Sequence, residues 1–414
     1  MRATWAGIGI IRLRLGLAVP IGIMRLPILT TTSRPVASVT TRLLRSALTL
    51  GRCRPITMQS GQLGYPASAN KRQGLVERGV PQSETRSQHL SMARKHKRLF
   101  DKIIDKGNFQ NAYLKTRKGK RKSMSYLEFK EYGALNLELL RQEVADGGYQ
   151  RAEFRNFYIY DPKMRLISGL PFRDRIVQHA LNNVLEPIYE PTYLPYTFAC
   201  RPNKGTHAGV RYIQAHLRRG RVTHFLKTDF SRYFPSIHCP TLYQIHDAKI
   251  HCWRTMALME IIQPRDETGI VIGSLKSQLN ANLYGTLADN FVHHTLKPMA
   301  WARYMDDMLL LDNDSARLHD MKKQLESFAA ETMHLRFSKW SVAPISRGVN
   351  FLGYRIWSKH KLLRKQSVTR ARRAVHSLRK RGDLPALNRF LAAWTGHARW
   401  ADTHNLMAHL EIAA

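Results

Sequence analysis

Two adjacent carboxylates, Asp306 and Asp307, stand in the stretch RYMDDMLLL, residues 303–311, between an aromatic residue and a run of apolar side chains. Adjacent acids repel each other, and burying an unpaired carboxylate is costly. A bound cation would remove both objections. A third acid, Asp229, ends the apolar stretch THFLKTDF, 77 residues before Asp306. These three carboxylates are the candidates for chemistry.

The elements around these acids can bring them together. We expect WARYMDDMLLLD to form a strand, an Asp-Asp turn and a strand, and THFLKTDF to form a strand that stops at Asp229. A hairpin tip can present its acids beside the end of a neighbouring strand. Three carboxylates meeting there would bind two Mg²⁺ ions, with Mn²⁺ as an alternative. Two such ions stabilise the attacking and leaving oxygens of a phosphoryl transfer.

For the Asp-Asp pair alone, a polar surface turn would be the better interpretation. However, a strand that ends in an acid, a helix that starts with Gly-Ser and a hairpin with two acids follow one another in this chain. This order is more specific than the Asp-Asp pair, and it favours the metal site. The helix start lies in IGSLKSQLNAN, after which Leu275, Leu279, Leu283 and Leu287 are expected to share one helix side.

The remaining pattern indicates an α+β fold. We expect a helix over residues 171–191 from the spacing of Val177 and Leu181, and a strand pair in GVNFLGYRIW. The tail from residue 361 is basic and has a helical period. Strands and helices alternate without a βαβ rhythm, which argues against a parallel sheet.

The charge of the chain points to a polyanionic partner. Its 414 residues contain 66 Lys and Arg against 30 Asp and Glu, a formal net charge of +36. Nucleic acid is the first candidate for such a partner and an anionic membrane surface the second. The four cysteines are too few and too scattered for a disulfide scaffold, and none has a zinc-ligand spacing such as C-x-x-C.

The first 91 residues differ from the rest, with 13 basic residues and two acids. Arginines interrupt the apolar stretches near the start, so no run is long enough to span a bilayer. An Arg-rich, acid-poor start is typical of an organellar transit peptide. The other interpretation is a start assigned too early, with Met92 of MARKHKRLFDKI as the true beginning, and we favour it. Residues 1–91 are then a disordered or untranslated extension.

KTDFSRYFPSI and RYMDDMLLL resemble the first metal-binding motif and the Tyr-x-Asp-Asp motif of the reverse transcriptase palm, and FLGYRIW resembles its primer-grip region. The resemblance implies a right-hand polymerase with fingers, palm and thumb, whose antiparallel palm sheet carries the catalytic acids. Asp229 and Asp306 would be the principal metal ligands, with the main chain of Phe230 contributing and Asp307 assisting. Phe234 falls where the family keeps an aromatic steric gate against the ribose 2′-hydroxyl. Packing in the core is its alternative role.

The residues at the expected helix start indicate which group of reverse transcriptases this chain resembles most. Most relatives read Gln-Gly-x-x-x-Ser-Pro, whereas this chain reads Ile272-Gly273-Ser274-Leu275-Lys276-Ser277-Gln278. This variant is similar to reverse transcriptases of diversity-generating retroelements, and LEFKEY, PYTFACRPNKGTHAGV and FLGYRIWSKHKLLRK resemble the phage-borne Bordetella-type members. The match runs from about Met92 to the C-terminus and leaves out residues 1–91.

Members of that family copy a template-repeat RNA into cDNA with frequent errors at adenines, and the cDNA replaces a variable repeat in a target gene. The resemblance therefore implies a primer, dNTPs and template RNA as substrates. It also implies a basic oligomeric accessory variability protein as partner and a cytoplasmic location in a bacterium, with no membrane contact.

The resemblance also assigns roles to the nucleotide-binding and primer-binding residues. Lys163 and Arg165 in DPKMRLIS would contact the triphosphate and base of the incoming nucleotide, where a guanidinium grips phosphate bidentately. Further nucleotide-binding and primer-grip residues would be Ile272, Gly273 and Gln278, and Leu352, Gly353 and Tyr354. Phosphate contacts of the thumb would come from Arg370, Arg372, Arg373, Arg379 and Lys380, whose alternative is a solvated helix face.

The expected domains are the fingers and the start of the palm at 92–220, the palm at 221–357 with a fingers insertion near 239–268, and a helical thumb at 358–414. Two alternatives remain open. One is a retron or group II intron-like enzyme, although little more than a thumb follows Trp357 and leaves no room for an endonuclease domain. The other is a nucleic-acid-binding protein with an inactive palm, against which the three acids argue.

Overall fold

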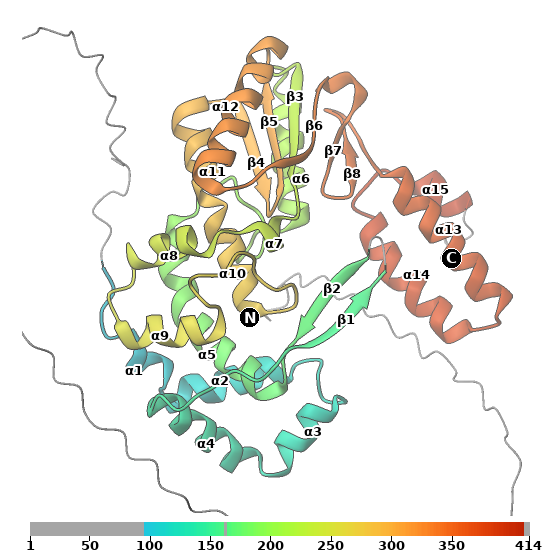
Figure 1. The fold of residues 1–414 in the computed structure, drawn as a ribbon. Helices are drawn as coiled ribbons and strands as arrows, with labels where there is room; N and C mark the ends of the chain where they lie inside the picture. Colours follow the sequence, from blue (N-terminus) through green and yellow to red (C-terminus); the bar gives the residue numbers. More distant parts are fainter. Residues whose placement is uncertain (1–94, 161–163, 410–414) are drawn as a thin grey trace, which may run out of the picture. The chain divides into compact units, whose positions relative to one another are not determined.

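The structure, a computed structural model, describes residues 95–160 and 164–409 (Figure 1). The chain divides into two units, and every described residue belongs to the unit that contains residues 89–414. The expected basic extension, residues 1–91, and Lys163 lie outside the described residues. None of the described helices is long and apolar enough to cross a lipid bilayer.

Helices form the first part of the described chain. They are α1 Leu99–Ile103, α2 Lys106–Arg117, α3 Met124–Glu131 and α4 Gly133–Ala145. α1, α2 and α3 pack against one long helix, α5 Phe172–Tyr189, and α4 packs against α2 and α3. The ring of Phe172 lies edge-on to that of Tyr126 with centroids 5.1 Å apart, a geometry that aromatic pairs favour. The helix predicted from Val177 and Leu181 is confirmed, and both side chains are fully buried.

A four-stranded antiparallel sheet carries the expected acids, in the order β4-β5-β3-β6. Its strands are β3 His224–Phe230, β4 Ala300–Tyr304, β5 Asp307–Asp312 and β6 Phe337–Pro344. The predicted strand, Asp-Asp turn and strand are confirmed by the pairing of β4 with β5. The predicted strand before Asp229 is confirmed as β3, which extends one residue further.

Both faces of this sheet are covered (Figure 1). Leu310 on β5 faces a core that it shares with α12 Ser315–Met333, and its neighbour Leu309 faces a second core that contains α6 Thr206–Arg218. A strand that is buried on both faces carries a continuous apolar run instead of an alternating pattern. This explains why residues 308–311 read Met-Leu-Leu-Leu.

Two smaller antiparallel sheets accompany the main one, so the fold is α+β as expected. The first is a hairpin and the second has three strands. The strands are β1 Arg155–Ile159 and β2 Arg165–Gly169, and then β7 Val349–Phe351, β8 Tyr354–Ile356 and β9 Lys361–Leu363. The strand pair predicted from GVNFLGYRIW is confirmed as β7 and β8.

The remaining helices connect these sheets and end the chain. Between β2 and β6 the short ones are the 3₁₀ turn Glu190–Thr192, α7 Tyr233–Ser236, α8 Cys239–Asp247, α9 Trp253–Ile262, α10 Leu275–Tyr284, α11 Thr286–Asn290 and the π-helix Phe291–Leu296. The 3₁₀ turn Ile345–Arg347 follows β6, and after β9 come α13 Lys365–Lys380, α14 Leu384–Ala398 and α15 His404–His409. The helical period predicted for the tail is confirmed.

The helix predicted to bury one side at residues 275–287 is different in the structure. It breaks at Gly285 into α10 and α11, and α10 is buried on several sides, including Lys276 and Asn280. It packs against α5, α7 and α8 at once. A Cβ atom at Gly285 would collide with the guanidinium of Arg303, so this glycine leaves the space through which Arg303 enters the core.

Candidate active site

The structure brings the three predicted acids to one end of the main sheet. Asp229 lies directly opposite Asp307 in the pairing of β3 with β5. Asp306 occupies the two-residue turn between β4 and β5, beside Met305, whose φ of 55° is left-handed. Tight hairpin turns require such a conformation, and it is uncommon for a residue other than glycine. The turn therefore places Asp306 next to the pair.

The charges of these acids disfavour one another. Burial and the negative charges of Asp229 and Asp307 raise the pKa of Asp306 from 3.8 to about 6, and the positive charge of Arg165 opposes this shift. Burial also raises the pKa of Asp307, against the opposing charges of Lys227 and Arg364. The site therefore holds negative charge that its own cations only partly neutralise.

Lys227 is a part of this site that sequence reasoning missed. Its Nζ atom donates hydrogen bonds to Asp307 Oδ2 at 2.9 Å and to the main-chain oxygen of Asn350 at 3.0 Å. It thus connects the sheet to the β7–β8 hairpin. Lys227 precedes Asp229 by two residues, and alternate residues of a strand share one face. That spacing is the signal that could have identified it.

Ser338 on β6 also holds a predicted acid. Its hydroxyl donates to Asp229 Oδ2 at 2.9 Å and to the main-chain oxygen of Asp229 at 3.1 Å. The pairing of β3 with β6 shifts register between Asp229 and Phe230. Such bulges re-aim side chains beside active sites. Ser338 lies 109 residues away along the chain, and no local pattern marks it.

The donor set fits a divalent cation in chemical kind, although the side chains are not gathered into a finished metal site. Among the described residues, no group of three or more His, Cys, Asp or Glu side chains could hold a metal ion as placed. Hard cations such as Mg²⁺ prefer carboxylate and carbonyl oxygens. Asp307 Oδ1 is buried and has no hydrogen-bond partner among the described residues, so it is one oxygen that such an ion could use.

The start of α10 lies against the β1–β2 hairpin, which carries Arg165. Ser168 on β2 donates from its main-chain nitrogen to the oxygen of Ile272 at 2.8 Å. Gly273 has a φ of 118°, and a Cβ atom there would lie 2.8 Å from the oxygen of Ser168. Only glycine permits both the conformation and the close approach. The hairpin that carries Arg165 therefore contacts Ile272 and Gly273, and the charge of Arg165 lowers the pKa of Asp306.

Phe234 and Gln278 lie on either side of this segment in the chain. Phe234 is half-buried against the main core, and its main-chain oxygen accepts from the nitrogen of Ile270 at 2.8 Å. That bond holds Phe234 beside Ile270, which precedes Ile272 by two residues in the chain. Gln278 is exposed, and its Oε1 lies 3.9 Å from the thiol of Cys200.

The predicted primer-grip residues form the turn of the β7–β8 hairpin. Leu352 and Gly353 are left-handed and half-buried, with φ of 50° and 91°. Tyr354 is fully buried, and its hydroxyl lies 3.2 Å from His207 Nε2 and 3.0 Å from His397 Nδ1. Its side chain therefore anchors the hairpin to α6 and α14.

The predicted phosphate-binding cations lie along α13, whose buried residues are Ala371 and Val375. All five are exposed: Arg370, Arg372, Arg373, Arg379 and Lys380. The main-chain nitrogen of Arg364, just before this helix, donates to the oxygen of Gly353 at 3.2 Å. The start of the basic helix is thus hydrogen-bonded to the hairpin turn.

Comparison with known proteins agrees with this arrangement. Residues 160–356 match the family described as reverse transcriptase (RNA-dependent DNA polymerase). Protein YkfC of Escherichia coli strain K12 is 25% identical over 296 residues, a match that covers 59% of this chain and 76% of that protein. The group II intron-encoded protein LtrA of Lactococcus lactis is 27% identical over 167 residues, covering 36% of this chain and 27% of LtrA.

Among solved structures, a telomerase from Candida albicans in complex with a fragment of telomeric RNA is similar at 12% identity. The similarity covers 55% of this chain and 50% of that one, with a TM-score of 0.38. The sequence matches alone carry the assignment, because the matched segment contains the acid strand, the helix start and the acid hairpin. Over residues 160–356 the chain therefore matches the reverse transcriptase family of RNA-dependent DNA polymerases.

Proposed function

We propose that this chain is the reverse transcriptase of a diversity-generating retroelement, which copies a template-repeat RNA into cDNA with errors at adenines. The observation that carries the proposal is Ile272, an apolar side chain held at the Gly273 turn beside the hairpin of Arg165. In this proposal residues 92–220 and the insertion near 239–268 are fingers, 221–357 palm and 358–414 thumb. A basic oligomeric accessory protein would assist, within a bacterial cytoplasm.

The reaction joins the 3′-hydroxyl oxygen of a primer to the α-phosphorus of a dNTP, and pyrophosphate leaves. Two Mg²⁺ ions, held by Asp229, Asp306 and the main-chain oxygen of Phe230, would stabilise charge on the attacking and leaving oxygens. Arg165 would grip the triphosphate through its guanidinium. Lys227 keeps Asp307 in place through its 2.9 Å ion pair.

Phe234→Ala is expected to raise incorporation of ribonucleotides relative to deoxyribonucleotides, because removing the ring opens space beneath the ribose. The measurement is primer extension with one rNTP competing against the matching dNTP. Phe291→Ala is the control, since Phe291 is also half-buried against the core but lies in the π-helix. Unchanged sugar discrimination in Phe234→Ala would leave Phe234 as a packing residue.

Ile272→Gln is expected to lower errors at template adenines more than at other bases. An amide at this position can hydrogen-bond and hold the templating nucleotide, whereas isoleucine can only pack. An adenine-thymine pair has two Watson–Crick hydrogen bonds, so a loosely held template tolerates mismatches there first. A restored penalty of about 1.4 kcal/mol means about tenfold fewer errors. Arg165→Ala, at the residue that would position the incoming nucleotide, is also expected to lower errors at template adenines more than at other bases.

Sequencing the cDNA that each variant makes on one defined RNA measures the error spectrum. Ile272→Leu is the matched control, because it keeps an apolar side chain of equal size and should retain the adenine errors. An adenine error rate in Ile272→Gln equal to that of the parent chain would remove Ile272 from the mechanism.

A group II intron-like enzyme is the second candidate, favoured by the similarity to LtrA and to nuclear intron maturase 2 of Arabidopsis thaliana, which is 35% identical over 95 residues. That match covers 13% of the maturase. The two candidates differ in their products. Adenine-directed errors on a defined RNA support the first candidate, and faithful cDNA with binding to a structured intron RNA supports the second.

A further inference from the structure

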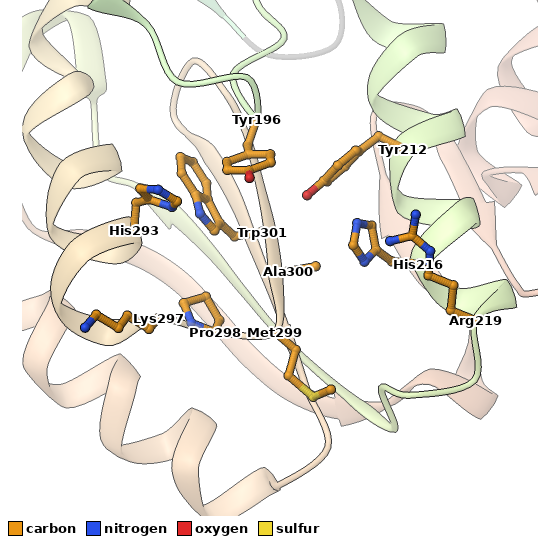
Figure 2. Close-up of a pocket in the computed structure, with 10 residues that line it drawn as sticks. All are labelled: Tyr196, Tyr212, His216, Arg219, His293, Lys297, Pro298, Met299, Ala300 and Trp301. Atoms are coloured by element: carbon orange, nitrogen blue, oxygen red, sulfur yellow. The ribbon is translucent and has the colours of Figure 1, made fainter.

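A cavity of about 470 Å³ lies at the end of β4 opposite the acid turn (Figure 2). At about 3.3 Å per residue, Ala300 lies about 13 Å along the strand from Tyr304. β4 is an edge strand of the main sheet. The loop at Tyr196 covers its Arg303 end through two main-chain hydrogen bonds of 3.0 Å, Arg303 to Tyr196 and Phe198 to Arg303. The cavity is beside the other end, at Ala300.

Aromatic rings form two walls of this cavity. On one wall Tyr196 lies edge-on to Trp301 with ring centroids 5.1 Å apart, and on the other Tyr212 lies 4.7 Å from His216. Figure 2 shows Tyr212 and His216 on α6 facing Tyr196 and Trp301 across the cavity, with the small side chain of Ala300 between the walls. The rings of Tyr196 and Tyr212 have centroids 5.7 Å apart.

Cations stand on both sides of these rings. Arg219 follows α6, Lys297 follows the π-helix, and both are exposed. The ten lining residues, all within the described part of the chain, include these two cations, two histidines and no carboxylate. The cavity therefore combines planar apolar surface with positive charge.

The backbone at one wall is unusual, and it aims two of these side chains. The π-helix Phe291–Leu296 carries His293, and Lys297 closes it in a left-handed conformation with a φ of 48°. π-helical turns are rare and occur frequently at functional sites. A left-handed lysine is also retained only where the surroundings hold it. Both features place His293 and Lys297 at the cavity.

We propose that this cavity binds one unpaired nucleotide, with its base against the rings of Tyr196 and Tyr212 and its phosphate at Arg219 and Lys297. Stacking on aromatic side chains joined to cationic phosphate contacts is the chemistry by which proteins hold single-stranded nucleic acid. The volume lies within the range of small-molecule pockets. A strand of bound RNA and a free nucleotide offer the same base and phosphate, and an extended peptide lacks both.

Photo-crosslinking to the full-length protein tests the proposal without requiring polymerase activity. The probe is a short single-stranded RNA that contains 4-thiouridine, and mass spectrometry locates the crosslinked peptides. Crosslinks are expected on the peptides that carry Tyr196 and Tyr212, whose side chains are partly exposed. Excess AMP distinguishes the two sources of the nucleotide: the crosslinks persist if a strand occupies the cavity and disappear if a free nucleotide does.

The Arg219→Ala, Lys297→Ala double variant is expected to reduce these crosslinks at least about tenfold. Arg221→Ala, Lys323→Ala is the matched control, because it removes the same charge from exposed residues that do not line the cavity. Tyr196→Leu should lower the yield similarly by removing a stacking surface, with thermal unfolding to confirm its fold. Crosslinks that map elsewhere, or equal yields in the double variant and its control, would overturn the proposal.

Discussion

Replacing Asp306 by Asn is expected to remove primer extension by at least about 1,000-fold while RNA binding stays within about twofold of the parent chain. The loss is large because metal ions at such a site contribute several kcal/mol of transition-state stabilisation, and an amide is a poor ligand for them. Binding persists because affinity for RNA comes from cations that neutralise phosphates. Primer extension and filter binding on the same RNA measure the two effects.

A second readout separates lost chemistry from lost folding. Burial and the charges of Asp229 and Asp307 raise the pKa of Asp306 from 3.8 to about 6, so its ionisation destabilises the fold progressively as the pH rises between these values and in full above about 6. The neutral amide should therefore leave the melting temperature at neutral pH unchanged or raise it. Asp266→Asn, at an exposed acid away from the sheet, is the matched control and should extend primers normally. Extension by Asp306→Asn within tenfold of the parent would rule out the assigned role.

Asp289→Ala is expected to lower the free energy of unfolding by about 3–5 kcal/mol, the usual result of leaving a buried charge without its partner. Arg303 and Asp289 are 0% and 1% exposed and form two parallel bonds, from Nε to Oδ1 at 2.6 Å and from Nη2 to Oδ2 at 2.7 Å. Arg303 also donates to the main-chain oxygen of Met305 at 3.2 Å. Urea denaturation measures the effect.

Two controls define the cause of that loss. Asp247→Ala breaks the 2.8 Å ion pair between Asp247 and Arg265, whose side chains are 45% and 37% exposed, respectively. This change should lower the free energy of unfolding by less than about 1 kcal/mol. The double variant Arg303→Met, Asp289→Leu replaces the buried pair by apolar groups and should recover most of the stability. A loss for Asp289→Ala as small as that for Asp247→Ala would show that Arg303 finds another partner.

The parts of the fold that the sequence predicted are those with local signals. The hairpin at residues 303–311 has an apolar run on one side of two acids, and the helix at 171–191 has a period of its own. α10 was predicted with one buried side, because periodicity cannot show that a helix is covered by several neighbours. Its buried polar residues, such as Lys276 and Asn280, are visible only in the packed structure.

In the candidate active site, too, only the residues with local sequence signals could be predicted. Asp229, Asp306 and Asp307 could be found because their types and flanking strands are local. Ser338 reaches Asp229 from a strand 109 residues away, and the cavity collects Tyr196, Tyr212 and Trp301 from three separate segments. Such groupings depend on how the strands pair and the helices pack, and no spacing along the chain encodes them.

The contact between Gly285 and Arg303 has a consequence for how this sequence can vary. Any side chain at position 285 would occupy the space of the guanidinium, and the guanidinium in turn requires the carboxylate of Asp289. Residues that share one interaction do not change independently. We therefore expect the three positions to vary together: once the arginine is replaced by an apolar residue, the glycine can become alanine and the aspartate can become apolar, whereas a side chain at position 285 is not tolerated while the arginine is present.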